Sequence, residues 1–204
     1  FVLRGYAGTG KTSIMAALVK ALGELKQPVV LLAPTGRAAK VLSRYAHAPA
    51  YTIHKYIYRQ DKLGTDAFSL SYNPHRDTLF IVDEASMVDN ALMCSLLKAV
   101  KPGARFILIG DADQLPSVGA GRVLNDLLDS GRFATVRLTE IFRQAQESLI
   151  VTNAHAINEG RYPDISRVDG DFFFLRRERD EDIAETVADL CANRLPRKYG
   201  EMAR

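Results

Sequence analysis

Eight residues near the start of the chain have the types and spacing of a phosphate-binding loop. Gly5-Tyr6-Ala7-Gly8-Thr9-Gly10-Lys11-Thr12 matches the pattern G-x-x-x-x-G-K-[ST]. Glycines let backbone N–H groups curl around phosphate oxygens, and the positive end of a following helix faces the same anion. Lys11 would neutralise the β- and γ-phosphates, and the Thr12 hydroxyl would ligate Mg²⁺. The residues predicted to bind the nucleotide are Gly5, Ala7, Gly8, Thr9, Gly10, Lys11, Thr12 and Ser13.

The neighbours of this loop favour the same interpretation. Residues 1–3 form a short apolar run that is typical of a strand. After the loop, apolar residues recur at helical spacing from Ile14 to Leu22. A chance match in a glycine-containing loop is the alternative, and a strand before the loop with a helix after it disfavours that alternative.

Acidic and amide side chains follow two further apolar runs. Residues 79–82 are apolar and end at Asp83 and Glu84, the Walker B pattern. Asp83 would hold Mg²⁺ directly or through a water, and Glu84 is placed to orient and deprotonate an attacking water. The apolar run 106–110 leads to Gln114, which can both donate and accept a hydrogen bond at a γ-phosphate. Because ligands bind at the carboxyl ends of parallel strands, we expect Lys11, Glu84 and Gln114 to line one crevice.

Apolar runs and helical patterns alternate along the chain, which predicts an α/β fold with a parallel sheet flanked by helices. The expected strands are residues 1–4, 29–33, 79–82, 106–110, 135–138 and 172–175. The expected helices are residues 13–25, 36–45, 90–99, 121–129, 148–159 and 182–193. Residues 56–77 interrupt this alternation. They fit either a small hairpin that turns at Gly64-Thr65 or an irregular loop.

Charge is unevenly divided along the chain. Residues 1–62 carry ten Lys and Arg against two acids, a net +8, whereas the remaining residues carry 17 against 22, a net −5. A polyanion near the phosphate loop and an ordinary solvated basic face both fit this division. Membrane spans need about 20 apolar residues, and no run here approaches that length. The two cysteines suggest no disulfide framework, so a cytoplasmic location is expected, with Cys94 as a small buried apolar residue.

Six segments in this order resemble motifs I, Ia, Ib, II, III and IV of superfamily 1 DNA helicases. The segments are residues 5–12, 33–39, 52–55, 82–87, 110–116 and 138–144. The chain is most similar to the superfamily 1B RecD/TraA branch (exonuclease V alpha-chain-like), whose members move 5′ to 3′ on single-stranded DNA. The resemblance implies a RecA-like P-loop NTPase fold for residues 1–155, with residues 56–77 as a pin-like hairpin. Residues 156–204 would connect to a second RecA-like lobe.

The resemblance also implies roles for particular residues. Arg143 would reach the γ-phosphate of ATP, where a guanidinium stabilises charge on the transferred oxygens. Contacts to phosphates of single-stranded DNA would come from Thr35, Arg37, His54 and Lys55. A structural histidine is the alternative for His54. The implied protein is an ATP-dependent DNA helicase of repair or recombination. Subunits of a helicase–nuclease complex are possible partners.

Several family motifs are missing from the chain. The glutamine motif that reads adenine would precede Phe1, and motifs V and VI would follow Arg204. We therefore expect the chain to be a piece of a longer protein, with weak ATP hydrolysis on its own. Other P-loop proteins, such as a small-molecule kinase or a nucleotide-dependent switch, stay open as alternatives. A non-enzymatic interaction module is disfavoured because Lys11, Asp83 and Glu84 are intact.

Overall fold

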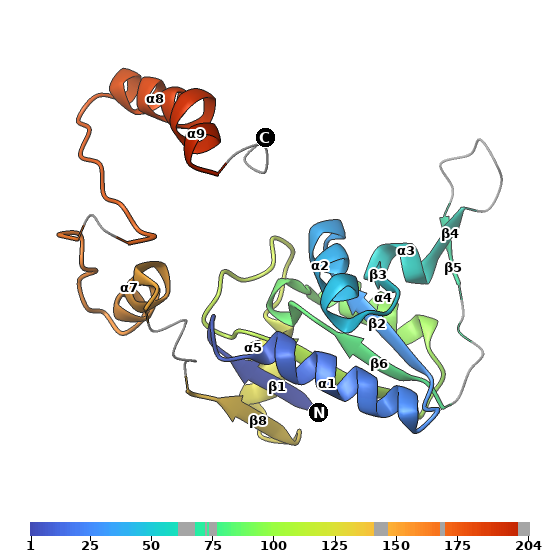
Figure 1. Ribbon diagram of the computed structural model, residues 1–204. Coiled ribbons are helices and arrows are strands. Elements are labelled where there is room, and N and C mark those ends of the chain that lie inside the picture. Colours follow the sequence, from blue (N-terminus) through green and yellow to red (C-terminus); the bar gives the residue numbers. More distant parts are fainter. Residues whose placement is uncertain (61–67, 72, 74–76, 141–146, 168–169, 200–204) are drawn as a thin grey trace. The chain divides into compact units, whose positions relative to one another are not determined.

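Parallel strands form the six-stranded sheet at the centre of residues 1–147 (Figure 1). The computed structural model describes residues 1–60, 68–71, 73, 77–140, 147–167 and 170–199. In sheet order the strands are β3 (Ala50–Thr52), β2 (Val29–Ala33), β6 (Leu79–Val82), β7 (Arg105–Gly110), β1 (Val2–Gly5) and β8 (Thr135–Leu138). Five of these strands were expected from the sequence, whereas the three-residue strand β3 was not. The sheet confirms the predicted α/β fold.

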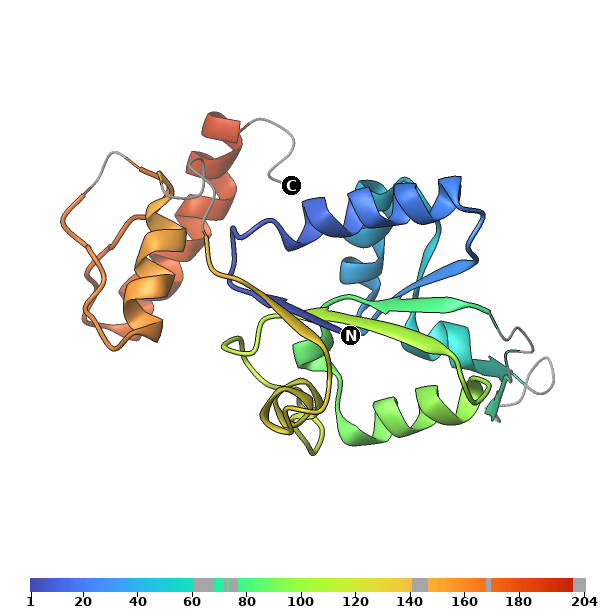
Figure 2. The same ribbon diagram turned by 90° about the horizontal axis from the view of Figure 1, so that it is seen from below.

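Helices cover both faces of this sheet (Figure 2). One face carries α1 (Lys11–Glu24) and α2 (Gly36–Ala46), and the other carries α3 (Ile53–Ile57), α4 (Asn90–Ala99) and α5 (Val123–Asp129). The all-apolar strand β6 explains this arrangement, because its side chains alternate between the two faces. Leu79 and Ile81 pack in the core beneath α1 and α2, while Phe80 and Val82 pack in the core beneath α3, α4 and α5. Two cores therefore fix the sheet that carries the site.

The segment that interrupts the alternation contains a pair of antiparallel strands. β4 (Tyr58–Gln60) and β5 (Phe68–Leu70) pair in the register Tyr58↔Leu70. The hydroxyl of Tyr58 also donates a hydrogen bond to Ser95 Oγ on α4 at 3.1 Å, which attaches the base of the pair to the main body. The predicted hairpin is confirmed for these strands. Its predicted turn at Gly64-Thr65 lies outside the described residues.

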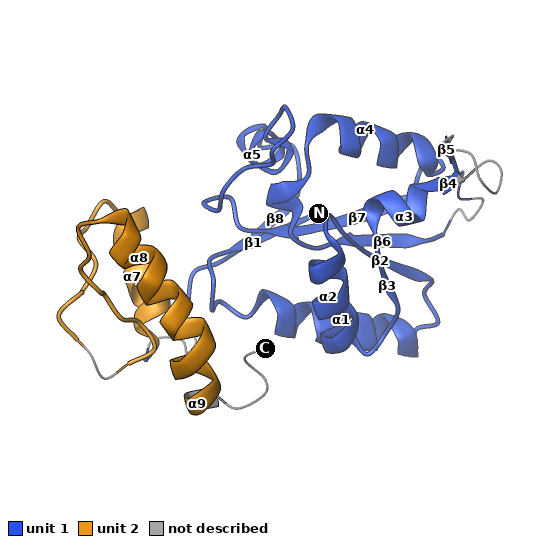
Figure 3. Cartoon of the chain, turned by 90° about the horizontal axis from the view of Figure 1, so that it is seen from above, with its two compact units in different colours: residues 1–147 blue, residues 148–204 orange. Residues whose placement is uncertain are grey.

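Residues 148–204 form a second compact unit (Figure 3). Its helices are α7 (Leu149–Asn158), α8 (Asp180–Asp189), η2 (Leu190–Arg194) and α9 (Leu195–Tyr199). The N-terminus of α7 is capped twice, because Val151 N–H donates to Ser148 Oγ at 3.3 Å and Leu149 N–H donates to Asp171 Oδ1 at 2.8 Å. These caps connect the start of α7 to the loop that precedes α8.

The strand predicted at residues 172–175 is wrong, because these residues belong to that loop. Phe173 and Phe174 are 49% and 55% exposed, and the described residues of the second unit contain no strand with which they could pair. An apolar run becomes a strand only where a neighbouring strand accepts its backbone hydrogen bonds. Within the described residues, no helix combines the length and the hydrophobicity needed to cross a bilayer.

Candidate nucleotide and DNA site

The phosphate loop joins β1 to α1 and needs backbone conformations that glycine favours. Gly8 and Gly10 have φ angles of 77° and 81°, in the left-handed region that side chains disfavour. Gly10 is also the N-cap of α1, and it provides no side-chain cap for the first helical turn. Because the N–H groups of this turn have no such partner, the start of α1 can receive an anion.

Lys11, the first residue of α1, turns its ammonium group back into the loop. Its Nζ donates hydrogen bonds to the carbonyl oxygens of Gly5 at 2.5 Å and Tyr6 at 2.8 Å. Burial lowers the pKa of Lys11, while the negative charges of Asp111, Glu84 and Asp83 oppose that shift. The negative charges of three carboxylates therefore act on the Lys11 ammonium.

Asp83 and Glu84 follow β6 directly, as the sequence predicted. Burial raises the pKa of Asp83, and the Glu84 N–H that donates to Asp83 Oδ1 at 3.0 Å opposes the shift. Burial also raises the pKa of Glu84, the carboxylates of Asp83 and Asp111 add to the shift, and Lys11 opposes it. A carboxylate with a raised pKa accepts a proton more readily, as a general base for water requires.

The backbone of Glu84 has an uncommon conformation. Its φ and ψ angles are 53° and 41°, in the left-handed region, and it forms the N-cap of η1 (Ala85–Met87). Such conformations in residues other than glycine cost on the order of 1–3 kcal/mol and concentrate at functional sites. The strain is consistent with a carboxylate that is held in position for its function at a cost to the stability of the folded protein.

Asp111 is a site residue that the sequence analysis did not select. It follows β7, is 6% exposed, and makes the largest Coulombic contribution among those that oppose the lowered pKa of Lys11. Its carboxylate accepts a hydrogen bond from Asp113 N–H at 3.1 Å. Part of the signal was available in the sequence, because an acid that follows a strand of a parallel sheet falls at its carboxyl edge, but only the strand order shows that β7 lies beside β6. The expected residue Gln114 has an exposed side chain, and its N–H donates to the Asp111 carbonyl at 3.3 Å.

The residues around the loop fit a Mg²⁺–nucleotide better than a free metal ion. Among the described residues, no group of three His, Cys, Asp or Glu side chains could hold a metal. Mg²⁺ needs few protein ligands, because substrate phosphates and waters complete its octahedral shell. Thr12 is half-buried on the first turn of α1, and Asp83 is half-buried at the end of β6, so one hydroxyl and one carboxylate are available. The other expected loop residues differ in exposure, with Thr9 buried and Ser13 exposed.

The residues expected to contact DNA lie at the starts of two neighbouring helices. β2 and β3 pair with Ala33 opposite Thr52, so α2 and α3 begin at the same edge of the sheet. Thr35 caps α2, since its Oγ1 accepts a hydrogen bond from Ala38 N–H at 3.2 Å. Arg37, His54 and Lys55 are exposed, and the His54 ring stacks on Tyr58 with centroids 6.1 Å apart. Arg143, the expected γ-phosphate contact, lies outside the described residues.

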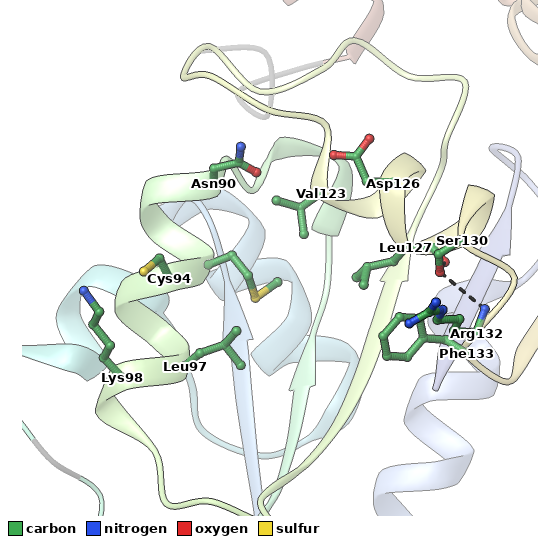
Figure 4. A pocket seen from close by; sticks show the side chains of 11 residues that line it. Asn90, Cys94, Leu97, Lys98, Val123, Asp126, Leu127, Ser130, Arg132 and Phe133 are labelled. Carbon is green, nitrogen blue, oxygen red and sulfur yellow. Dashed lines mark hydrogen bonds between the residues drawn. The ribbon is translucent and has the colours of Figure 1, made fainter.

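An apolar groove of about 720 Å³ lies between α4 and α5, and it includes none of the predicted site residues (Figure 4). Cys94 lines this groove and is exposed, so the prediction that it is buried is wrong. At 100° per residue, Cys94 falls on the opposite side of α4 from the buried residues Leu92 and Leu96.

The chain is similar to several known proteins. A family model described as an AAA domain matches residues 1–171. The ATP-dependent RecD2 DNA helicase of Deinococcus radiodurans is 40% identical over 163 residues, covering 79% of this chain and 22% of that protein. The RecBCD enzyme subunit RecD of Mycobacterium tuberculosis is 36% identical over 191 residues, covering 78% of this chain and 32% of that protein.

Among solved structures, the Pif1 helicase from Bacteroides in complex with ADP-AlF3 and single-stranded DNA matches with a TM-score of 0.52 and 21% identity. The match covers 98% of this chain and 53% of that one. It confirms the expected RecA-like fold, and the RecD relatives confirm the resemblance seen in the motifs. This chain spans about a fifth to a third of the length of those two RecD relatives. Because the family model matches residues 1–171, most of the chain, this chain belongs to the AAA domain family.

Proposed function

We propose that this chain is the ATP-binding motor lobe of a DNA helicase, which couples ATP hydrolysis to 5′-to-3′ movement on single-stranded DNA. One observation carries the proposal. The ammonium of Lys11 lies in the phosphate loop, hydrogen-bonded to the carbonyl oxygens of Gly5 and Tyr6, and the negative charges of Asp83, Glu84 and Asp111 act on it electrostatically. The relative with 40% identity is named an ATP-dependent DNA helicase, which supports this reaction for the present chain.

Each site residue has a role in this proposal. Lys11 binds the β- and γ-phosphates, and Thr12 and Asp83 hold Mg²⁺, which when bound neutralises charge on the phosphates. Glu84 accepts the proton of the attacking water, and its raised pKa supports that role. Gln114 and Arg143 contact the γ-phosphate.

The DNA would follow the beginnings of α2 and α3. The exposed cations Arg37 and Lys55 and the exposed ring of His54 lie where β2 and β3 end, beside the helix N-terminus that Thr35 caps. Cations and helix N-termini bind phosphates and do not read bases. The antiparallel pair β4–β5, within the predicted segment 56–77, acts as a pin that separates the strands of a duplex.

The proposal extends to partners and location. A second RecA-like lobe of the same longer chain completes the motor, with residues 156–204 as the connection. The relative from Mycobacterium tuberculosis is named as a RecBCD subunit, which supports membership in a helicase–nuclease complex of DNA repair and recombination. The two free cysteines fit a reducing cytoplasm.

The experiment uses the full-length protein and measures ATP hydrolysis with and without single-stranded DNA. We expect DNA to stimulate hydrolysis, Lys11→Ala to abolish it, and Lys20→Ala, an exposed lysine on the same helix, to leave it unchanged. Unwinding of a duplex with a 5′ overhang, but not of one with a 3′ overhang, tests the direction. Hydrolysis by Lys11→Ala at the wild-type rate would contradict the assignment of the loop.

A further inference from the structure

A tyrosine of the phosphate loop contacts an arginine of the edge strand β8. Arg137 Nη2 donates a hydrogen bond to Tyr6 Oη at 3.0 Å, and the guanidinium carbon of Arg137 lies 5.8 Å from the centre of the Tyr6 ring. The parallel pairing of β1 with β8 sets this contact, because Arg4 lies opposite Arg137 and Tyr6 follows β1. The side chain of Tyr6 therefore joins the loop to the strand through both its hydroxyl and its ring.

The main chain of Tyr6 organises the rest of the loop. Its carbonyl oxygen accepts hydrogen bonds from Lys11 Nζ at 2.8 Å and from Thr9 Oγ1 at 2.8 Å. It also lies 3.4 Å from the N–H of Thr9, which donates to it. The orientation of the Tyr6 peptide thus sets where the Lys11 ammonium and the buried Thr9 side chain lie.

The tip of the loop has little packing of its own. Ala7 and Gly8 are exposed, and Gly8 has no side chain with which to anchor its left-handed conformation. The conformation of the loop must therefore be held from its two sides. Thr9 holds one side by its bond to Tyr6, and the contact with Arg137 holds Tyr6 itself.

We propose that Tyr6 and Arg137 form a brace that positions the phosphate loop for nucleotide binding. The inference rests on the proposed binding of ATP at Lys11. Arg137 is a positioning residue, because the hydrogen bond and the ring contact that it makes with the loop are both to Tyr6. A guanidinium presents five N–H donors in a planar fork, whereas a lysine ammonium is a compact charge on a flexible stem, so lysine is not an equivalent replacement at this contact.

The test measures the Kd of the full-length protein for ADP and for a non-hydrolysable ATP analogue, each with Mg²⁺. Arg137→Ala is expected to raise both values about 3- to 10-fold, since it removes a hydrogen bond and a cation–π contact. Tyr6→Phe keeps the ring and is expected to raise them less. Arg137→Lys should not restore wild-type affinity. The control Arg132→Ala, an exposed arginine with the same change of charge, should stay within about twofold of wild type.

The double variant Tyr6→Phe/Arg137→Ala distinguishes a brace from two separate structural contributions. A brace predicts that it binds nucleotide no more weakly than Arg137→Ala alone, whereas independent effects would multiply. Effects that multiply in the double variant would overturn the proposal. Wild-type nucleotide affinity in both Tyr6→Phe and Arg137→Ala would also overturn it. If Arg137→Ala fails to fold, Tyr6→Phe and Arg137→Lys decide the question. If Lys11→Ala loses nucleotide binding while the Tyr6 and Arg137 variants keep it, only the brace is rejected. Wild-type binding by Lys11→Ala would instead reject the proposed function.

Discussion

Glu84→Gln should separate nucleotide binding from hydrolysis. The substitution keeps the size of the side chain and its left-handed backbone, but it removes the carboxylate that burial, Asp83 and Asp111 make more basic. Loss of a general base lowers rates by about 10²–10⁴-fold. At about 1.4 kcal/mol per factor of ten, that corresponds to about 3–5.5 kcal/mol of the activation barrier. Nucleotide affinity should stay within about threefold of wild type, because Lys11 and the loop are intact.

The same substitution has a pH-dependent effect on stability. An acid whose pKa is raised by folding contributes stability that is present below its unfolded pKa and lost as pH rises through its folded pKa. As pH rises through the folded pKa of Glu84, the wild-type protein loses this contribution, whereas a glutamine has none to lose. The stability of Glu84→Gln relative to the wild type should therefore increase from pH 4 towards pH 7.

Two assays on the full-length protein check these expectations. Single-turnover hydrolysis with single-stranded DNA measures the chemical step, and thermal unfolding between pH 4 and pH 7 measures the stability difference. Glu24→Gln, an exposed glutamate at the end of α1, is the control for the change of charge. Hydrolysis within threefold of wild type would place the base elsewhere, and a stability difference that is independent of pH would contradict the burial of Glu84.

Three further predictions concern DNA binding, the core and the loop. If the protein contacts three or four phosphates of single-stranded DNA, a plot of log K for DNA binding against log[salt] should have a slope of about −2 to −3. The double variant Arg37→Ala/Lys55→Ala should flatten this slope by about 0.7 for each lost contact. An unchanged slope would reject the proposed DNA path. Phe80→Ala removes a fully buried ring that stacks on the Phe106 ring, with the two centroids 5.2 Å apart. The substitution should lower the free energy of unfolding, measured with denaturant, by about 3–5 kcal/mol. A loss below about 1 kcal/mol would contradict its place in the core. Gly8→Ala, at a φ of 77°, should weaken ADP binding measured by calorimetry, and unchanged affinity would show that the left-handed conformation is dispensable.

The sequence by itself determined the elements whose signal is local. The buried run of β6 and the glycines before Lys11 each follow from residues adjacent in the chain, and the structure places them as predicted. The strand predicted at residues 172–175 failed because a strand needs a partner, which no property of its own residues supplies. The burial predicted for Cys94 failed because the buried face of α4 is decided by what packs against it.

Contacts between distant segments were decided only by the tertiary structure. The sequence placed Asp83 and Glu84 near Lys11 through the rule for strand ends, but the order of the strands in the sheet brings Asp111 into the same cluster. The left-handed backbone of Glu84 likewise has no signature in its residue type. Arg137 lies 131 residues from Tyr6 in the chain, and the contact exists because β8 pairs with β1 at the sheet edge. Residue types define the chemistry available to this site, whereas the pairing of strands far apart in sequence selects which charges and rings meet there.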